Sequence, residues 1–374
     1  MLTQLALTGL IVALLPLSVV WGSKDPDKYR KLAWVTVFLT FDLIMFGAFT
    51  RLTDSGLGCP DWPGCYGHAN PLQAHEHISA AQAAMPGGPV SVAKAWIEMV
   101  HRYFAMAVGV LIISMIIIAV RGWLKSRRQD QRFSPRLPAL LLAFVCLQGA
   151  FGAWTVTLKL QPVIVTIHLL LGMGLLGLLT WQAARQSIHP PVSAAATSLR
   201  LPAAICLAVL ATQLALGGWV STNYAALACM DFPLCHGSAM PDMDFANGFS
   251  LWRQLGKTAG GEYLPFPALT AIHWTHRCFA GVVLLAVGWT AHKALRVPGL
   301  QRTGRWLLAA LALQLLTGIS TVFLEWPLAL AVMHNGGAAL LLLLLVMLNF
   351  KAGIPAQAAS QTASATHRVG QPAA

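Results

Sequence analysis

Long apolar runs separated by short polar segments dominate the chain. A transmembrane helix needs about 20 predominantly apolar residues, and eight runs clearly meet that requirement. These eight runs lie near 30–50, 98–120, 137–157, 162–184, 199–220, 271–292, 303–324 and 327–350. The pattern predicts an all-α integral membrane protein that crosses the bilayer several times.

A ninth apolar run lies near residues 4–22, at the start of the chain. It lacks the basic segment and the small-residue cleavage site that are typical of a secretory signal peptide. We therefore expect it to be retained as an extra N-terminal membrane helix, with cleavage as the alternative.

The composition and the charge distribution support a membrane location. The chain is 56% hydrophobic and 10% charged, whereas soluble domains average about 25% charged residues. Its net charge of +12 is concentrated in short connections that all fall on one side of an alternating topology. The positive-inside rule makes that side cytoplasmic. The charge is therefore a topology signal, and no nucleic-acid partner is expected.

This topology predicts a multi-pass protein of a bacterial inner membrane, in contact with membrane lipid. The two long loops, 51–97 and 221–270, carry few basic residues and are expected to be periplasmic. The C-terminus is expected to be cytoplasmic.

Each long loop contains two cysteines separated by five residues, in "GLGCPDWPGCYG" and in "ALACMDFPLCHG". Disulfides persist in a periplasm, and the prolines can bend each loop, so we expect the pairs Cys59–Cys65 and Cys229–Cys235. A redox-active pair is the alternative, although the spacing is wider than Cys-x-x-Cys, and zinc binding is a more remote one. The other cysteines, Cys146, Cys206 and Cys278, fall in predicted helices and are expected to pack as small apolar side chains.

The cysteine loops belong to an internal repeat. "GAFTRLTDSGLGCPDWPGCYG" aligns with "GGWVSTNYAALACMDFPLCHG" at an offset of 170, and later positions align at an offset of 166. Both halves start on the same side of the membrane, so the repeat is parallel. We expect two pseudo-symmetric four-helix bundles side by side, which together form an eight-helix core.

The repeat divides the chain into four parts. We expect an extra N-terminal helix with a cytoplasmic linker over 1–29, a first four-helix unit over 30–185 and a second over 186–350. The remaining 351–374 are rich in Ala, Ser and Gln and are expected to form a disordered cytoplasmic tail.

Four histidines lie inside the predicted helices, two in each half: His101, His168, His276 and His334. An ionisable side chain inside a membrane is costly and marks a functional site by default. All four lie within about two turns of the outer helix end, and inward-facing histidines on two helices can bind one haem iron from both sides. A single such histidine could be a satisfied core residue, but the repeated pairing favours axial haem ligation.

The two sites differ beside their histidines. Glu98 precedes His101 by one helical turn, whereas the aligned residue in the second half is His273. Glu98 could bind a water or relay a proton at the edge of a haem, or it could be a solvated residue at a helix end. His273 could be a spare ligand, a propionate partner or an inert residue. Arg102 and Arg277 are candidates for binding haem propionates, because a guanidinium pairs well with a carboxylate.

Together, "FGAFTRLTDSGLGCPDWPGCYG", "EMVHR", His168, "GGWVSTNYAALACMDFPLCHG", "HWTHR" and "VMHNGG" resemble the haem A synthase family over about residues 30–350. The resemblance implies an enzyme that oxidises the C8 methyl of haem O to a formyl group by two successive hydroxylations, giving haem A for cytochrome c oxidase. It implies that the second half holds haem b through His276 and His334, and that the first half takes haem O between His101 and His168. It also implies that Glu98 is catalytic.

The family's pathway implies transient contact with a haem O synthase and with oxidase assembly factors. The electron donor and the oligomeric state cannot be inferred from the sequence. The extra N-terminal helix departs from the family's eight-helix core, as does a histidine-rich stretch, "HANPLQAHEH", in the first loop. That stretch is expected to be a solvated loop, with metal capture by His68, His75 and His77 as the alternative.

Two other functions fit parts of the pattern. A di-haem b cytochrome that only transfers electrons would use the same four histidines, with Glu98 incidental. A periplasmic thiol-oxidising membrane protein would use the cysteine loops and tolerate loss of the histidines. The haem A synthase interpretation accounts for more of the residues than either alternative.

Overall fold

The computed structural model describes residues 1–354, and nine helices in that range are long and apolar enough to cross a membrane. They are α1 (Leu2–Gly22), α2 (Lys28–Leu52), α4 (Val92–Lys125), α5 (Arg136–Thr157), α6 (Pro162–Gln186), α7 (Arg200–Thr222), α9 (Phe266–Leu295), α10 (Gln301–Phe323) and α11 (Leu328–Gly353). These helices confirm the prediction of an all-α, multi-pass membrane protein. The apolar run at the N-terminus is one of them.

Shorter helices lie in the connections. They are α3 (His75–Ala84), α8 (Phe245–Gly248) and the 3-10 helices η1 (Gln131–Phe133) and η2 (Ala194–Leu199). Helix α3 includes part of the histidine-rich stretch that was expected to be a loop. At the other end of the chain, α11 continues to Gly353, past the predicted start of the tail at 351. The rest of that predicted tail lies outside the described residues.

The helix termini follow local sequence signals. Ser91 begins α4, and its hydroxyl accepts a hydrogen bond from the backbone N–H of Lys94. Pro162 occupies the first turn of α6, where its missing N–H costs nothing. After α2 and α7, the chain turns at Asp54 and Tyr224, which adopt φ angles of 51° and 54°. These two residues are 170 positions apart, so the repeat extends to unusual backbone conformations.

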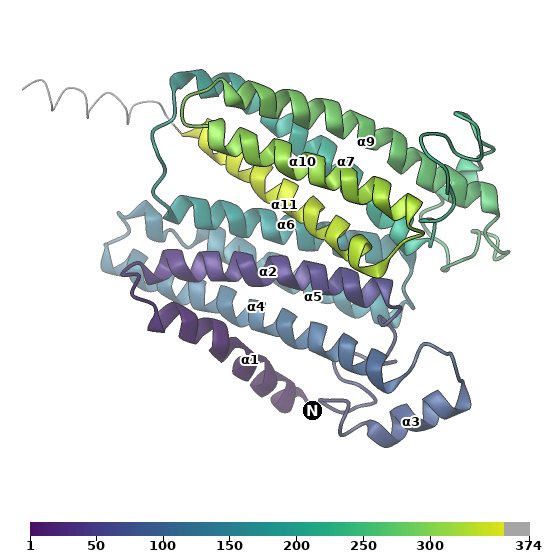
Figure 1. Ribbon diagram of the computed structural model, residues 1–374. Coiled ribbons are helices and arrows are strands. Elements are labelled where there is room, and N and C mark those ends of the chain that lie inside the picture. Colours follow the sequence, from purple (N-terminus) through teal and green to yellow (C-terminus); the bar gives the residue numbers. More distant parts are fainter. Residues whose placement is uncertain (355–374) are drawn as a thin grey trace, which may run out of the picture.

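Helix packing follows the repeat (Figure 1). Helices α2, α4, α5 and α6 pack as one group, and α7, α9, α10 and α11 pack as another. The two groups meet through α2, α6, α7 and α11, whose buried apolar residues join one continuous core. The helices of the two groups correspond in order, α2 to α7, α4 to α9, α5 to α10 and α6 to α11, so the two groups are built in the same way.

Repeat-equivalent residues also meet where the two groups join. Arg51 Nη2 donates a hydrogen bond to the carbonyl oxygen of Ser221 over 2.7 Å, and the Tyr224 hydroxyl donates to Asp54 Oδ1 over 2.6 Å. Arg51 is 170 residues from Ser221, and Asp54 is 170 residues from Tyr224. Equivalent positions meet in this way when two copies of a unit are related by an approximate two-fold axis.

Helix α1 lies outside the two groups. It packs lengthwise along α4 and also contacts α2, at the edge of the first group (Figure 1). Gly9 makes the approach to α4 close, because a Cβ on this residue would lie 2.8 Å from Met106 Cβ. Among the described residues, the second group has no helix in the corresponding place.

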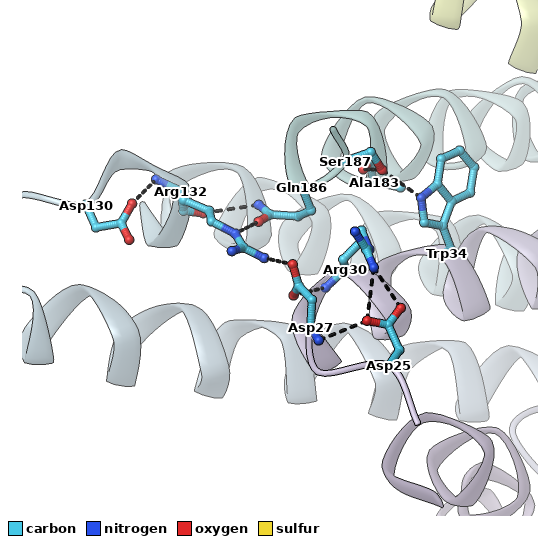
Figure 2. Close-up of polar contacts among 9 residues, drawn as sticks. All are labelled: Asp25, Asp27, Arg30, Trp34, Asp130, Arg132, Ala183, Gln186 and Ser187. Atoms are coloured by element: carbon cyan, nitrogen blue, oxygen red, sulfur yellow. Dashed lines mark hydrogen bonds and ion pairs between the residues drawn. The ribbon is translucent and has the colours of Figure 1, made fainter. Parts of the chain in front are cut away.

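A polar cluster ties the connections together at the end of the bundle that is predicted to be cytoplasmic. Figure 2 shows Arg132, which lies in η1 between α4 and α5. Its guanidinium donates hydrogen bonds to Asp27 and, over 2.8 Å, to Gln186 Oε1. Asp25 pairs with Arg30 over 2.9 Å. The linker between α1 and α2 is thereby fixed to η1, between α4 and α5, and through Arg132 to the end of α6.

Candidate functional site

A large cavity lies among the helices, with a volume of about 1090 Å³. Side chains of both halves line it, including the four histidines singled out in the sequence: His101, His168, His276 and His334. Pockets for one drug-sized ligand are typically about 300–1,000 Å³, so this cavity has room for a large ligand.

Each of the four imidazole rings packs against a glycine on a neighbouring helix. In the first half, a Cβ on Gly47 would lie 3.0 Å from His101 Cε1, and a Cβ on Gly152 would lie 3.2 Å from His168 Cε1. In the second half, the corresponding distances from Gly217 to His276 and from Gly318 to His334 are both 3.0 Å. A side chain at any of these glycines would crowd the ring of its histidine.

Each glycine–histidine pair has an equivalent in the other half, so the same arrangement occurs four times. Gly109, Gly149 and Gly172 also line the cavity. Gly109 and Gly149 have no atom within 4 Å of an added Cβ among the described residues, whereas an added Cβ on Gly172 would lie 3.2 Å from Gln148 Nε2. Contact with a histidine ring thus distinguishes Gly152 from these three glycines.

The donor set fits haem. Each half offers two imidazoles to the cavity, and His101 Nδ1 and His168 Nδ1 are buried without a hydrogen-bond partner among the described residues. No group of three or more His, Cys, Asp or Glu side chains suited to a metal ion occurs in the described part of the chain. Two imidazoles per site, in an apolar cavity, suit a prosthetic group that carries its own equatorial ligands.

Glutamine side chains accompany three of the four histidines. Gln148 Nε2 lies 3.5 Å from His168 Nε2, and Gln314 Nε2 lies 3.3 Å from His334 Nε2. Gln213 Nε2 lies 3.2 Å from His276 Nδ1. The position equivalent to Gln213 in the first half is Leu43, which has no polar atom to offer.

Glu98 lies in the wall of the cavity and is tied to the first cysteine loop. It is 4% exposed, and its Oε2 accepts a hydrogen bond from the backbone N–H of Cys59 over 2.8 Å. Its Oε1 accepts a short hydrogen bond from Arg102, one turn further along α4. Glu98 is therefore a buried, paired carboxylate, so the alternative of a solvated helix end is wrong.

His273 occupies the equivalent place in the second half. It is 5% exposed, and its Nδ1 accepts a hydrogen bond from the backbone N–H of Cys229 over 3.2 Å. Glu98 and His273 therefore share a structural task, which is to hold the N–H of the first cysteine in each loop. They differ in the group that each adds to the cavity wall.

Arg102 and Arg277 both line the cavity, but their guanidinium groups bind loop carbonyls. Arg102 donates to the carbonyl oxygens of three loop residues at 2.6–3.2 Å, and these residues are Asp61, Pro63 and Gly64. Arg277 donates to those of Cys229, Asp231 and Leu234 at 2.5–3.0 Å. Both arginines thus hold a cysteine loop against its helix, and propionate binding by them stays a prediction.

Both cysteine pairs are joined as disulfides, Cys59–Cys65 and Cys229–Cys235. Within the second loop, Asp231 accepts hydrogen bonds from the backbone N–H groups of Gly237 and His236 at 2.8 and 2.7 Å. The bonds from Gly237 and then His236 hold the pKa of Asp231 below its ordinary value. Asp61 accepts the same pair of bonds in the first loop, from Tyr66 and Gly67.

The other cysteines and the loop histidines differ in their surroundings. Cys206 is buried, as expected, whereas Cys146 and Cys278 are exposed and line the cavity. Of the loop histidines, His68 and His77 stack with ring centroids 6.0 Å apart, and His75 lies 3.5 Å from the Ser79 hydroxyl. They do not form a three-ligand group among the described residues, so metal capture there gains no support.

Residues 30–346 match a family described as cytochrome oxidase assembly protein. A haem A synthase from Shewanella oneidensis is 38% identical over 326 residues, which cover 86% of this chain and 96% of that protein. A haem A synthase from a Caulobacter species is 29% identical, over 84% of this chain and 94% of the relative. A third, from Rhodopseudomonas palustris, is 27% identical, over 81% of this chain and 85% of the relative. The chain belongs to the haem A synthase family of cytochrome oxidase assembly proteins.

Proposed function

We propose that this protein is an oxidoreductase that converts haem O to haem A for cytochrome c oxidase. Its membership of a family with curated haem A synthases supports this proposal. The observation that carries it is the fourfold arrangement of a cavity-lining histidine against a glycine, two in each half. The proposed reaction oxidises the C8 methyl group of haem O by two successive hydroxylations, and the resulting gem-diol loses water to give the formyl group.

The two halves have different tasks in this proposal. His276 and His334 would hold haem b, which supplies one-electron transfer when it is bound. His101 and His168 would flank the substrate haem O. The unequal polar surroundings of the two histidine pairs support unequal tasks, because His276 and His334 have Nδ1 contacts that His101 and His168 lack among the described residues.

Glu98 is the residue we assign to chemistry. It is the carboxylate of the first half that lines the cavity one turn from a proposed ligand, and His273 takes its place in the second half. The N–H of Cys59 and the guanidinium of Arg102 fix both carboxylate oxygens. A carboxylate fixed in this way can accept or return a proton at the reacting oxygen without reorganising.

In keeping with the predicted topology, the cysteine loops would close the site on the periplasmic side. In each hydroxylation molecular oxygen would be the oxidant, and an electron donor of unknown identity would supply the reducing equivalents that convert its second oxygen atom to water. Haem O synthase and oxidase assembly factors would be transient partners.

A di-haem electron-transfer cytochrome is the second candidate, since it needs the same four histidines. It would leave both haems chemically unchanged and would have no use for the carboxylate of Glu98. The buried ion pair of Glu98 with Arg102 favours the synthase, which has a use for the carboxylate. The cytochrome would use the same pair only to hold the structure.

Haem extraction and mass analysis test the proposal. The wild type and Glu98→Ala would be purified from cells that supply haem O. We expect haem A or its hydroxylated precursor in the wild type, and only haem O and haem b in Glu98→Ala. If both proteins contain haem b alone, in two sites, the protein is an electron-transfer cytochrome and the proposal is wrong.

A further inference from the structure

The histidines of the two halves differ in what holds their rings. His334 Nδ1 lies 3.0 Å from the Thr317 hydroxyl, and that hydroxyl lies 3.1 Å from the carbonyl oxygen of Gln314. The chain of bonds runs in one direction, in which Nδ1–H donates to Thr317 and Thr317 donates to Gln314. A hydrogen bond at Nδ1 fixes the tautomer, which leaves Nε2 as the nitrogen that binds a metal.

The surroundings of His276 differ. Gln213 Nε2 lies 3.2 Å from His276 Nδ1 and 3.4 Å from its Nε2, and it donates to the backbone carbonyl of His276 over 3.2 Å. An amide nitrogen donates and does not accept, so Gln213 holds the α9 backbone at His276 and offers no acceptor to an Nδ1–H. The acceptor at Nδ1 is therefore a feature of His334 and Thr317.

The first half lacks both partners at the equivalent positions. Leu43 replaces Gln213 at the offset of 170, and Phe151 replaces Thr317 at the offset of 166. His101 Nδ1 and His168 Nδ1 are accordingly buried without a hydrogen bond to any described residue. The glycines behind the rings are the same in both halves, so the difference is confined to these polar partners.

We propose that Thr317 is a positioning residue that fixes the His334 imidazole for permanent haem ligation, and that Phe151, at the equivalent position, leaves the His168 imidazole free to release a haem. This inference rests on the proposed function, in which one site keeps its haem and the other must take up a substrate and release a product. Loss of a hydrogen-bond partner of a ligating histidine typically costs about 10–100-fold in metal affinity. A difference in haem affinity of that size suits a first site that releases its haem as product and a second site that keeps its haem.

The test is the rate at which haem leaves the purified, full-length protein for an excess of apomyoglobin. We expect Thr317→Val to speed loss of the second-half haem by about 10-fold or more. Thr317→Ser keeps the hydroxyl and should restore the wild-type rate. Thr212→Val is the matched control, because Thr212 is exposed beside Gln213 and its hydroxyl bonds only a carbonyl of its own helix.

The reciprocal variant, Phe151→Thr, gives His168 the missing hydroxyl and should slow loss of the first-half haem. A second readout is the midpoint potential of the second-half haem, which should rise in Thr317→Val because the ligand loses basicity when its Nδ1–H loses an acceptor. If Thr317→Val only loosened the packing, its Tm would fall and the midpoint potential would not rise, which would contradict the inference.

The outcomes distinguish this inference from the proposed function. If His334→Ala removes a haem but Thr317→Val loses haem at the wild-type rate, the inference is wrong and the proposed function stands. If neither His276→Ala nor His334→Ala changes the haem content, the second half holds no haem and both are wrong.

Discussion

At the residue scale, Glu98 has a structural role in holding the first cysteine loop and a proposed chemical role in proton transfer. Substitutions can separate the two roles. The Glu98 carboxylate holds the N–H of Cys59 and the guanidinium of Arg102, both buried with it. His273 performs the first of these tasks in the second half with an imidazole nitrogen. Any acceptor of suitable reach can therefore hold the loop, whereas proton transfer at the proposed substrate site needs the carboxyl group itself.

Glu98→Gln is expected to abolish haem A formation while leaving the protein folded. The glutamine oxygen can still accept from Cys59, so we expect a loss of stability of about 1–2 kcal/mol, the range of one charged hydrogen bond. Glu98→Ala should cost about 3–5 kcal/mol, because it leaves Arg102 buried without its partner. Tm in detergent and haem analysis of both variants measure the two effects. Full haem A formation by Glu98→Gln would show that the carboxyl group has no chemical role.

The sequence predicts the histidines at this scale but not what surrounds them. His101, His168, His276 and His334 are visible because a polar residue in an apolar run is costly and these four recur at fixed offsets. The bonds of Arg102 and Arg277 to loop carbonyls could not be predicted, because an arginine near a helix end is equally suited to a propionate. Gln213 and Thr317 could have been found from the repeat, as positions where the aligned residues change from apolar to polar.

At the scale of elements, each cysteine loop is fastened to one helix at several points. A disulfide closes it, a glutamate or histidine accepts from its first cysteine, and an arginine binds its carbonyls. The shape of each loop therefore depends on the helix that also carries a proposed haem ligand, α4 for the first loop and α9 for the second. This arrangement favours a structural role for the disulfides over a redox role.

Replacing both Cys59 and Cys65 by Ser is expected to lower stability by about 2–3 kcal/mol, the value for closing a loop this short. Haem A formation per folded molecule should remain, because Glu98 keeps Arg102 and the backbone N–H of residue 59. Tm with and without a reductant, together with haem analysis, measures both. A variant of wild-type Tm that makes no haem A would contradict the structural role and favour the thiol-oxidising alternative.

Helix α1 is an element without a counterpart in the repeat, and it contacts the first half alone. It packs on α4 at Gly9 against Met106, which also lines the cavity. Interiors are close-packed, so a displacement of α1 is transmitted to α4 and to the wall of the cavity. We infer that α1 supports the shape of the first site.

Gly9→Leu is expected to force α1 away from α4, at a cost of about 1–3 kcal/mol for overpacking. It should reduce haem A formation and leave the haem b content unchanged, because the principal contacts of α1 are with α4 and α2 of the first half. Gly22→Ala is the matched control on the same helix, since an added Cβ there meets no described atom within 4 Å. Equal loss of both haems in Gly9→Leu would mean that α1 supports the whole bundle.

At the scale of the whole molecule, two units of the same plan have diverged around one cavity. The repeat predicts the helix order and the loop positions, because these depend on periodicity and offset. It does not predict that the cavity joins both halves, since that depends on how α2, α6, α7 and α11 pack. Helix α3 was also missed, because its alanines and histidines carry no apolar periodicity.

The division of labour between the halves is tested most directly by removing one histidine pair at a time and identifying the haem that disappears. His276→Ala with His334→Ala should abolish haem b and leave haem O bound but unconverted. His101→Ala with His168→Ala should abolish haem O and haem A and leave haem b in place. Loss of the same haem from both double variants, measured by extraction and mass analysis, would contradict separate cofactor and substrate sites.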